Sequence, residues 1–525
     1  MKQTDGELKY PVGIQTFAKI REGGYVYVDK TVYIHKLIKQ GQFYFLSRPR
    51  RFGKSLLLST IEAYYEGKRY LFEGLALSTL ADDWEPHEVL HIDLNSGDYR
   101  NIEGLNEVLD SYLQRWEKKY SINNTYTSPG LRFGSIIRRA AETSNKKVVI
   151  LVDEYDKPLL NAIDDKVYAE ELRVVLRDFY STLKTEDRHI EFAMLTGVAR
   201  FSKVSVFSDL NNLRDISFEE AYSGLCGISD RELRIYFTEG IRLLSEKTGL
   251  TVNQTFEELK HRYDGYHFAV GTEGIYNPFS LMNVFSANRM DNYWFESGTP
   301  SYLVKLLRSG DWILKDLSGY TVGEEVLKSS GIVTKDPIPA LYQSGYLTMV
   351  SYDRELGMVT LDYPNAEVKQ GFLKYLLPFY TASVPSRTDF DIASFVREVR
   401  NGDIPGFMKH LTSMVAGVPY SEKYRPSESH FQNIIYLLYT LLGFYVNMEM
   451  KTSDGRIDLV VSTSIYVYIF EFKIDKTAEA AMAQIHNKHY WLPYLASDKK
   501  IYLIGANFNT STRRLDGWIS EKVED

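Results

Sequence analysis

Residues 43–55 decide the fold of this chain, and they read Phe43-Tyr44-Phe45-Leu46-Ser47-Arg48-Pro49-Arg50-Arg51-Phe52-Gly53-Lys54-Ser55. The first five residues are an apolar run that predicts a buried strand, and residues 56–65 follow with the spacing of a helix. A strand, a loop that ends in Gly-Lys-Ser and a helix is the order found in phosphate-binding loops. The complete pattern would have a glycine in place of Arg48.

The Gly-Lys-Ser end of this loop has the residue types that nucleotide chemistry needs. Gly53 lets the backbone turn close to phosphate oxygens, and Lys54 offsets the charge of the β and γ phosphates. The hydroxyl of Ser55 ligates Mg²⁺, while the free N–H groups at the start of the helix face the anion. The loop therefore predicts a site for ATP and Mg²⁺, formed by Arg51, Phe52, Gly53, Lys54, Ser55 and Leu56.

A second apolar run, residues 147–152, leads directly into Asp153 and Glu154. Open parallel sheets bind their ligands at the carboxyl ends of such strands. We expect Asp153 to hold Mg²⁺ through water and Glu154 to orient and polarise the attacking water. The alternative is that the two carboxylates only cap the helix that follows.

Three polar residues near the next apolar run are further candidates. Thr196 follows the run 190–195, either as the polar sensor residue of AAA-type ATPases or as an ordinary strand-ending threonine. Arg200 and Arg214 could reach a γ-phosphate, but arginines are also common on protein surfaces.

Four continuous apolar runs, separated by amphipathic helical stretches, predict a parallel α/β sheet with strands Phe43–Ser47, Val89–Leu94, Val148–Val152 and Ile190–Leu195. The chain divides into three predicted segments. Residues 1–217 contain the P-loop sheet, and residues 218–380 predict a helical lid or winged-helix region. A polar stretch near residues 381–391 begins the third segment, residues 381–525, which predicts helices, a hairpin, a helix over 477–494 and a strand over 500–504.

The hairpin of the third segment pairs Arg456–Val461 with Ile465–Lys473. If the turn is centred near Ser464, Asp458 lies almost opposite Glu471, and such directly opposed side chains are ~5 Å apart at Cβ. Glu471 and Lys473 are two residues apart in a strand, so they project from the same face. Three charged groups therefore converge at the end of otherwise apolar strands.

Burying these carboxylates is unfavourable without a counter-ion, and Mg²⁺ or Mn²⁺ suits ligands made only of oxygen. We expect Asp458 and Glu471 to hold the cation and Lys473 to stabilise the developing charge on a scissile phosphate. An exposed strand end with a Glu/Lys ion pair is the alternative. It predicts alternating polar and apolar residues, whereas the second strand is apolar on both faces as far as Glu471.

Two flanking positions could extend this site. Glu428 lies at the start of a predicted helix over 429–442, where it is either a third carboxylate or a helix cap. Gln484 and Lys488 lie four residues apart on the predicted helix after the hairpin, so they face one way and could contact the site and a phosphate. A solvated helix face is the competing interpretation.

Composition restricts the class of protein. The single cysteine, Cys226, excludes an internal disulfide framework and a multi-cysteine zinc site, and it fits a reducing compartment. No apolar run approaches the ~20 residues needed to span a bilayer. We therefore expect a cytoplasmic protein without a membrane partner. The net charge of −7 does not exclude nucleic-acid binding, because a local basic track is sufficient for it.

Short motifs recur along nearly the whole chain, at residues 25–31, 48–55, 152–156, 263–266, 276–278, 297–300, 341–347 and 363–365. In combination they resemble a bacterial and archaeal family in which an AAA-ATPase-like domain precedes a PD-(D/E)xK nuclease superfamily domain. The resemblance implies a restriction-endonuclease-like αββαβ domain at the C-terminal end, nucleotide chemistry by Lys54, Ser55, Asp153 and Glu154, and phosphodiester hydrolysis by Asp458, Glu471 and Lys473 with the assistance of Gln484.

Three hypotheses follow. The first is an ATP-regulated nuclease that acts on nucleic acid, with DNA the favoured substrate; a role in defence or in mobile elements and an oligomeric state are open extensions of it. The second is a non-cleaving, ATP-dependent switch that binds nucleic acid or a partner. The third is a pseudo-ATPase scaffold for the nuclease, which the arginine at position 48 motivates.

Overall fold

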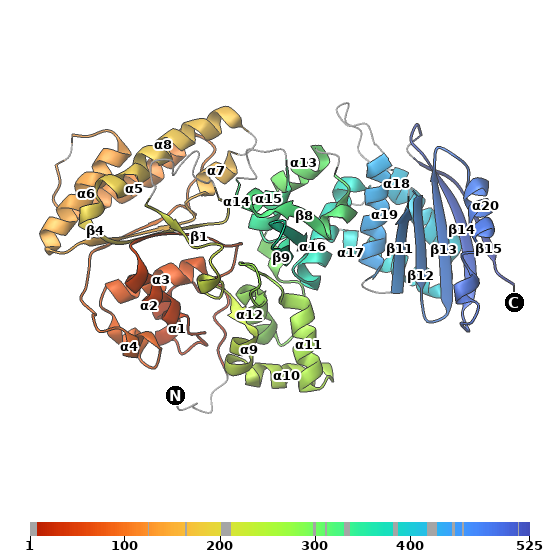
Figure 1. Ribbon diagram of the computed structural model, residues 1–525, viewed down its shortest axis with the longest axis horizontal. Coiled ribbons are helices and arrows are strands. Elements are labelled where there is room, and N and C mark those ends of the chain that lie inside the picture. The colour runs from red at the N-terminus through yellow and green to blue at the C-terminus, as the bar shows by residue number, and fades with distance from the viewer. Residues whose placement is uncertain are drawn as a thin grey trace. The chain divides into compact units, whose positions relative to one another are not determined.

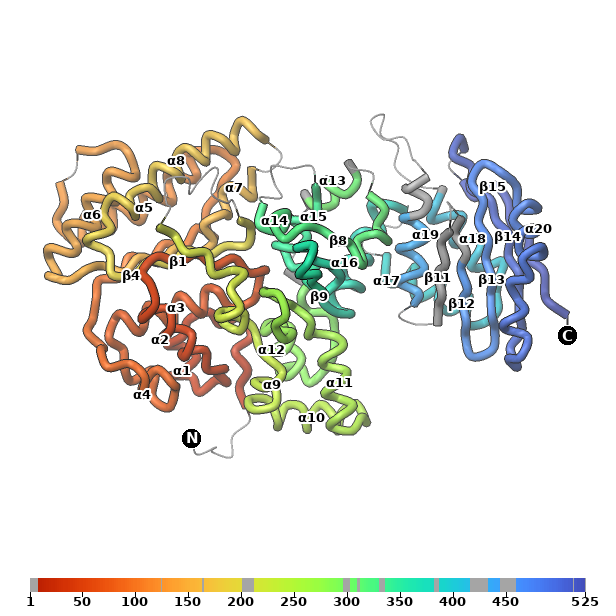
Figure 2. The backbone as a smooth tube through the Cα atoms, in the orientation of Figure 1, coloured from red at the N-terminus to blue at the C-terminus, as the bar shows by residue number. Residues whose placement is uncertain are grey.

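The structure is a computed structural model that divides into two compact units, and each unit is described by itself (Figures 1 and 2). The first unit comprises residues 1–297 and 319–368, and the second comprises residues 298–318 and 369–525. The structure describes residues 8–123, 125–162, 165–200, 212–297, 301–309, 312–329, 336–381, 387–416, 428–443, 447–453, 456–512 and 514–524.

A five-stranded sheet forms the centre of the first unit, with the strand order β2-β3-β4-β1-β5. All neighbouring strands are parallel, so the predicted parallel α/β sheet is confirmed. Every residue of β1 and β3 is buried, as their continuous apolar sequences require. The strands are β1 (Phe43–Ser47), β2 (Val89–Asp93), β3 (Val148–Asp153), β4 (Ile190–Gly197) and the two-residue β5 (Arg214–Asp215), which was not predicted.

Helices cover both faces of this sheet (Figure 1). One face is covered by α5 (Ile102–Lys119), α6 (Pro129–Ser144) and α8 (Lys166–Thr185), whose apolar side chains form one core cluster with the sheet. The other face is covered by α1 (Phe17–Glu22), α2 (Thr31–Gln40), α3 (Lys54–Tyr65) and α4 (Leu77–Leu80). The short α7 (Lys157–Asn161) follows β3.

The rest of the first unit is largely helical, as the sequence predicted. It contains α9 (Asp230–Tyr236), α10 (Thr238–Thr248), α11 (Val252–Tyr263), α12 (Pro278–Ala287), α14 (Glu324–Lys328) and α15 (Ile338–Gln343). Two small antiparallel sheets were not predicted: β6 (Ile228–Ser229) with β7 (Ile275–Tyr276), and β8 (Tyr320–Gly323) with β10 (Met358–Asp362) and β9 (Thr348–Asp353). The predicted segment boundaries at residues 217 and 380 remain predictions.

Two of the sequence motifs that lie far apart in the chain pack against each other in this region. A Cβ atom at Gly265, whose φ is +99°, would lie 2.0 Å from the carbonyl oxygen of Pro364. The side chain of Asn365 donates a 2.8 Å hydrogen bond to the carbonyl of Asp264. These motifs therefore hold the fold together, because only glycine allows so close a backbone approach.

The second unit contains a five-stranded sheet with the order β11-β12-β13-β14-β15. β13 and β14 are parallel, and the other pairs are antiparallel. Helices α17 (Thr388–Asn401), α18 (Ile404–Ala416) and α19 (Glu428–Gly443) lie on one face, and α20 (Ala478–Lys488) lies on the other (Figure 1). The strands are β11 (Asn447–Ser453), β12 (Arg456–Ser462), β13 (Tyr466–Ile474), β14 (Lys500–Asn509) and β15 (Arg514–Lys522).

The predicted hairpin is confirmed, and its register places Asp458 opposite Glu471. The outer strands β11 and β15 were not predicted, and β14 is longer than predicted. The prediction of a helix as far as residue 494 was wrong. His489 takes a left-handed conformation with a φ of 52° and ends α20, and a separate turn of 3₁₀ helix follows at Leu492–Tyr494.

Candidate active sites

The phosphate-loop glycine has the conformation that such a loop needs. Gly53 caps the N-terminus of α3 with a φ of 91°, where a side chain would strain the backbone. Lys54 is the first residue of α3 and is buried. Its ammonium donates to the carbonyl oxygens of Arg48 at 3.2 Å and Pro49 at 3.4 Å. The backbone of the loop therefore surrounds the ammonium of Lys54 at the start of α3.

One of the two predicted carboxylates at the end of β3 meets this lysine. The Oε1 atom of Glu154 lies 3.4 Å from the Nζ atom of Lys54. The hydroxyl of Thr196 donates a 2.6 Å hydrogen bond to Oδ1 of Asp153, and both side chains are buried. Since β4 lies between β1 and β3, its carboxyl end brings Thr196 between the loop and the acidic pair. This contact places Thr196 beside Asp153, and its role as a sensor residue remains a prediction.

A pocket of about 560 Å³ opens beside the loop. Its lining includes six of the predicted loop and acidic residues: Arg51, Gly53, Lys54, Ser55, Leu56 and Glu154. Arg50, Asn95 and Lys157 also line the pocket, and two further walls come from distant parts of the sequence: Pro11, Gly13, Ile14 and Gln15 near the N-terminus, and Pro278, Phe279 and Met282 on α12. Of these wall residues only Pro278 lies in one of the motifs, at residues 276–278, and none of them was predicted to line the site.

Two loop side chains have distinct positions. Phe52 is buried behind the loop, edge-on to Tyr266 and Phe268 with ring centroids 4.7 and 5.2 Å away, and it is not among the pocket-lining residues. Arg51 has a φ of 67°, and its guanidinium lies 3.6 Å from the centre of the Phe279 ring. A cation–π contact therefore joins the loop to α12 across the pocket.

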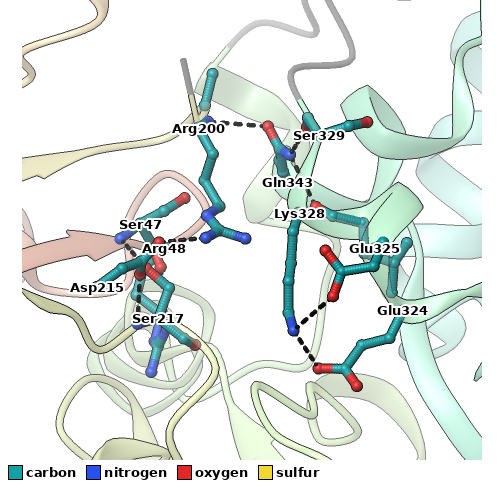
Figure 3. A network of polar contacts seen from close by, with 12 residues as sticks. Ser47, Arg48, Arg200, Asp215, Ser217, Glu324, Glu325, Lys328, Ser329 and Gln343 are labelled. Atoms are coloured by element: carbon teal, nitrogen blue, oxygen red, sulfur yellow. Dashed lines mark hydrogen bonds and ion pairs between the residues drawn. The ribbon is translucent and has the colours of Figure 1, made fainter. Parts of the chain in front are cut away.

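Arg48 explains how the loop accommodates an arginine in place of glycine. Its side chain is 1% exposed and donates to the carbonyl oxygens of Ser47, Ser217 and Tyr222 at 2.9, 2.8 and 3.1 Å. Figure 3 shows Arg48 beside Ser47 and Ser217. The guanidinium also lies 4.1 Å from the centre of the Phe268 ring. The arginine therefore anchors the base of the loop to later parts of the first unit.

Asp156 is a buried acid that the sequence reasoning did not assign to the site. Its Oδ2 atom accepts hydrogen bonds from the backbone N–H groups of Val198 at 3.0 Å and Ala199 at 2.6 Å. Burial, together with the neighbouring charge of Glu154, raises the pKa of Asp156 to about 7. The only signal in the sequence is its place in the motif at residues 152–156.

The two candidate arginines take other positions. Arg200 forms an ion pair with Asp215, and Arg214 pairs with Glu219 at 2.6 Å. Neither arginine is among the described residues that line the pocket beside the loop.

The second candidate site lies on β13 in the other unit. Glu471 is fully buried and Lys473 is 8% exposed. The ammonium of Lys473 donates to Oε1 of Glu471 and, at 2.6 Å, to Oε1 of Gln484 on α20. The Nε2 atom of Gln484 in turn donates to the hydroxyl of Tyr490 at 3.2 Å. The structure thus brings together three of the predicted residues, while Lys488 of α20 is exposed.

The remaining predicted ligands can be placed only by their backbone. Asp458 pairs in register with Glu471, and Glu428 is the first residue of α19. Their side chains lie outside the part of the chain whose side chains the structure describes. Within the described part, no three His, Cys, Asp or Glu side chains form a group that could hold a metal ion. Cation binding by Asp458 and Glu471 therefore remains a prediction.

Comparison with known proteins defines the class that this fold and these sites belong to. Residues 11–207 match the family described as a predicted AAA-ATPase, and residues 426–518 match the PD-(D/E)XK nuclease superfamily. An uncharacterized protein from the vnfD 5′ region of Azotobacter chroococcum mcd 1 is 37% identical over 531 residues, which cover 98% of this chain and 99% of that protein. The chain therefore belongs to the same family, in which an AAA-ATPase-like domain is joined to a C-terminal PD-(D/E)XK nuclease superfamily domain.

A solved structure of the ORC2 protein from Aeropyrum pernix, in ADPNP and ADP complexes, is 12% identical to this chain with a TM-score of 0.24. The match covers 69% of this chain and 92% of that one. No helix among the described residues is long and apolar enough to cross a membrane.

Proposed function

We propose that this chain hydrolyses ATP with Mg²⁺ in its first unit and cleaves phosphodiester bonds of nucleic acid with Mg²⁺ or Mn²⁺ in its second unit. The observation that carries the first half is the pair of Lys54 and Glu154, which line a pocket of about 560 Å³, with Thr196 bonded to Asp153 at the ends of the neighbouring strands. The second half is supported by the buried contacts of Lys473 with Glu471 and Gln484.

The residues beside the pocket fit a nucleoside triphosphate and its cation. The pocket volume lies within the range of small-molecule sites. Lys54 and the N-terminus of α3 offer a positive charge and free N–H groups to phosphate oxygens. The hydroxyl of Ser55 and the carboxylate of Asp153 supply the oxygen ligands that Mg²⁺ prefers. A bound Mg²⁺ would neutralise charge on the β and γ phosphates during transfer.

Glu154 is the residue that we assign to activation of the attacking water. Its carboxylate is partly exposed to the pocket and contacts Lys54 at 3.4 Å. The phosphates of a nucleotide compete with this carboxylate for the ammonium. Glu154 then becomes available to accept a hydrogen bond from water, which is the role of a general base.

In the second unit, Lys473 is the residue that we assign to the scissile phosphate. Gln484 holds its ammonium at 2.6 Å, so the side chain has one fixed position. Glu471 lies on the same face of β13, and the register of the hairpin brings the backbone of Asp458 opposite it. Two carboxylates at this position suit a hard divalent cation, which supplies Lewis-acid activation of phosphate and water. We propose nucleic acid, and DNA before RNA, as the substrate.

A nuclease assay tests the proposal. Wild type, Glu471→Ala and Lys54→Ala are incubated with linear DNA or RNA, with Mg²⁺ or Mn²⁺, and with or without ATP. We expect metal-dependent cleavage that Glu471→Ala abolishes and ATP hydrolysis that Lys54→Ala abolishes. Glu521→Ala and Lys68→Ala change exposed residues of the same types in the two units and should behave as wild type.

Two results would contradict the proposal separately. Absence of cleavage by the folded wild type under all these conditions would remove the nuclease assignment and favour a non-cleaving switch. ATP hydrolysis that survives in Lys54→Ala would remove the ATPase assignment.

A further inference from the structure

The chain segment that follows β4 is attached to the acidic residues at several consecutive positions. Thr196 donates its hydroxyl to Asp153 at 2.6 Å. Two residues further on, the backbone N–H groups of Val198 and Ala199 donate to Asp156 at 3.0 and 2.6 Å. A displacement of the acidic residues therefore has to displace the segment from Thr196 to Ala199 as well.

The other end of this segment is attached to a glutamine from a distant helix. The backbone N–H of Arg200 donates a 3.0 Å hydrogen bond to Oε1 of Gln343, the last residue of α15 (Figure 3). The Nε2 atom of Gln343 donates to the carbonyl oxygens of Leu327 and Ser329, at 3.0 and 2.8 Å, at the end of α14. One buried side chain thus joins the segment to α14 and α15.

The side chain of Arg200 fixes this end of the segment further. Its guanidinium forms an ion pair with Asp215 and lies 4.7 Å from the centre of the Phe218 ring. Arg200 is only 9% exposed, so water does not readily replace these contacts. Figure 3 shows Gln343 above the guanidinium and Asp215 beside it.

We propose that Gln343 is a positioning residue for ATP hydrolysis, which couples Thr196 and the acidic residues to helices α14 and α15. This inference rests on the ATPase half of the proposed function. An amide side chain is required because it can accept from one N–H group and donate to two carbonyl groups at once. The direct path runs from Asp153 through Thr196 and the backbone to Arg200, then through Gln343 to α14.

A double-mutant cycle tests this coupling. ATP affinity and kcat are measured for wild type, Thr196→Val, Gln343→Leu and the double variant, with a fluorescent ATP analogue and a phosphate-release assay. We expect Gln343→Leu to leave the Kd within about twofold and to lower kcat about tenfold. Because both changes interrupt one path, the double variant should be no slower than the slower single variant to within about twofold.

Glu325→Ala is the matched control, because Glu325 lies on α14 and its exposed carboxylate pairs with Lys328 at 3.3 Å. It should retain wild-type kcat. Gln343→Glu is the second variant, because it keeps the acceptor for Arg200 but lacks the amide donors to Leu327 and Ser329. It should keep most of the kcat. In wild type we expect ATP to change the hydrogen exchange of α14, and in Gln343→Glu this change should be absent.

The possible results separate the two proposals. ATP turnover that Lys54→Ala does not abolish overturns the proposed ATPase function itself. If turnover depends on Lys54, a wild-type kcat in Gln343→Leu, or multiplication of the two single losses in the double variant, overturns the coupling. If Gln343→Leu does not fold, an approximately tenfold loss of kcat in Gln343→Glu relative to wild type, together with an unchanged exchange response of α14, overturns it.

Discussion

The ammonium of Lys54 lies 3.4 Å from the carboxylate of Glu154, so the residue assigned to phosphate binding is paired with the residue assigned to water activation. The lysine is buried and the glutamate is partly exposed to the pocket. The two residues lie on the segments after β1 and β3, the two strands that flank β4 in the sheet. Nucleotide binding has to exchange this ion pair for contacts with phosphate.

We predict that Glu154→Gln separates binding from turnover. The amide cannot accept a proton from water, so kcat should fall about 100-fold or more. Because a neutral side chain competes less for Lys54, the affinity for ATP should be equal to or higher than that of wild type. Equilibrium binding and single-turnover hydrolysis measure the two quantities. A parallel loss of affinity would contradict the assignment of Glu154 to catalysis alone.

Arg48→Gly, which recreates the complete glycine pattern, should destabilise the first unit. The change removes hydrogen bonds to the carbonyls of Ser217 and Tyr222 and the contact with Phe268. We expect the free energy of unfolding to fall by roughly 3 kcal/mol, measured by urea denaturation. Arg50→Gly, in the same loop but partly exposed, is the control and should cost less. A rise in stability for Arg48→Gly would show that the arginine is not an anchor.

The pair of Glu471 and Lys473 should contribute to stability as well as to chemistry. Glu471→Ala leaves the buried ammonium of Lys473 without that carboxylate, which should destabilise the second unit by about 3–5 kcal/mol. The double variant Glu471→Leu/Lys473→Met removes both charges and should be more stable than Glu471→Ala. Chemical denaturation checks this order, with the exposed Glu521→Ala as control. The reverse order would mean that the two charges are not coupled.

The stability of the first unit should decrease as pH rises towards neutrality. Glu367 is buried and accepts hydrogen bonds from the N–H groups of Tyr293 and Trp294 and from the hydroxyl of Ser280. Burial raises its pKa from 4.5 to about 7. Between these values the folded chain binds more protons than the unfolded chain, so the free energy of unfolding falls as pH rises, by roughly 3 kcal/mol in total.

Glu367→Gln should reduce this pH dependence, because its amide stays neutral while Oε1 accepts both N–H groups and Nε2 donates to Ser280. Thermal unfolding between pH 4.5 and 8 measures the effect. Burial also raises the pKa of Asp156 to about 7. Asp156 therefore accounts for any pH dependence of stability that remains in the variant. The exposed Glu355→Gln is the control. An unchanged pH profile in Glu367→Gln would contradict the assignment.

Sequence patterns predicted those features of the fold that depend on residues close together in the chain. The apolar runs of β1 and β3 are buried on both faces, and a hairpin turn centred near Ser464 predicted the register that pairs Asp458 with Glu471. The contact of Gln484 with Lys473 agrees with the predicted helix face. These features depend on neighbours within one or two elements.

The pocket walls could not be predicted in the same way. Ile14 and Phe279 lie more than two hundred residues apart in the sequence, and each is an ordinary apolar residue whose role comes only from tertiary packing. The acceptor role of Asp156 depends on the path of the chain after β4, which no motif describes. The outer strand β15 has an exposed, mixed sequence that does not alternate clearly.

The anchoring of Arg48 has a consequence for sequence variation among related proteins and for engineering. The loop and the residues at 217 and 222 are joined through one side chain, although they lie about 170 positions apart. A chimera that receives a glycine-type loop without matching changes around Ser217 would lose this connection. We expect related sequences to vary at these positions together, so that the loop and its distant support form a single evolutionary unit.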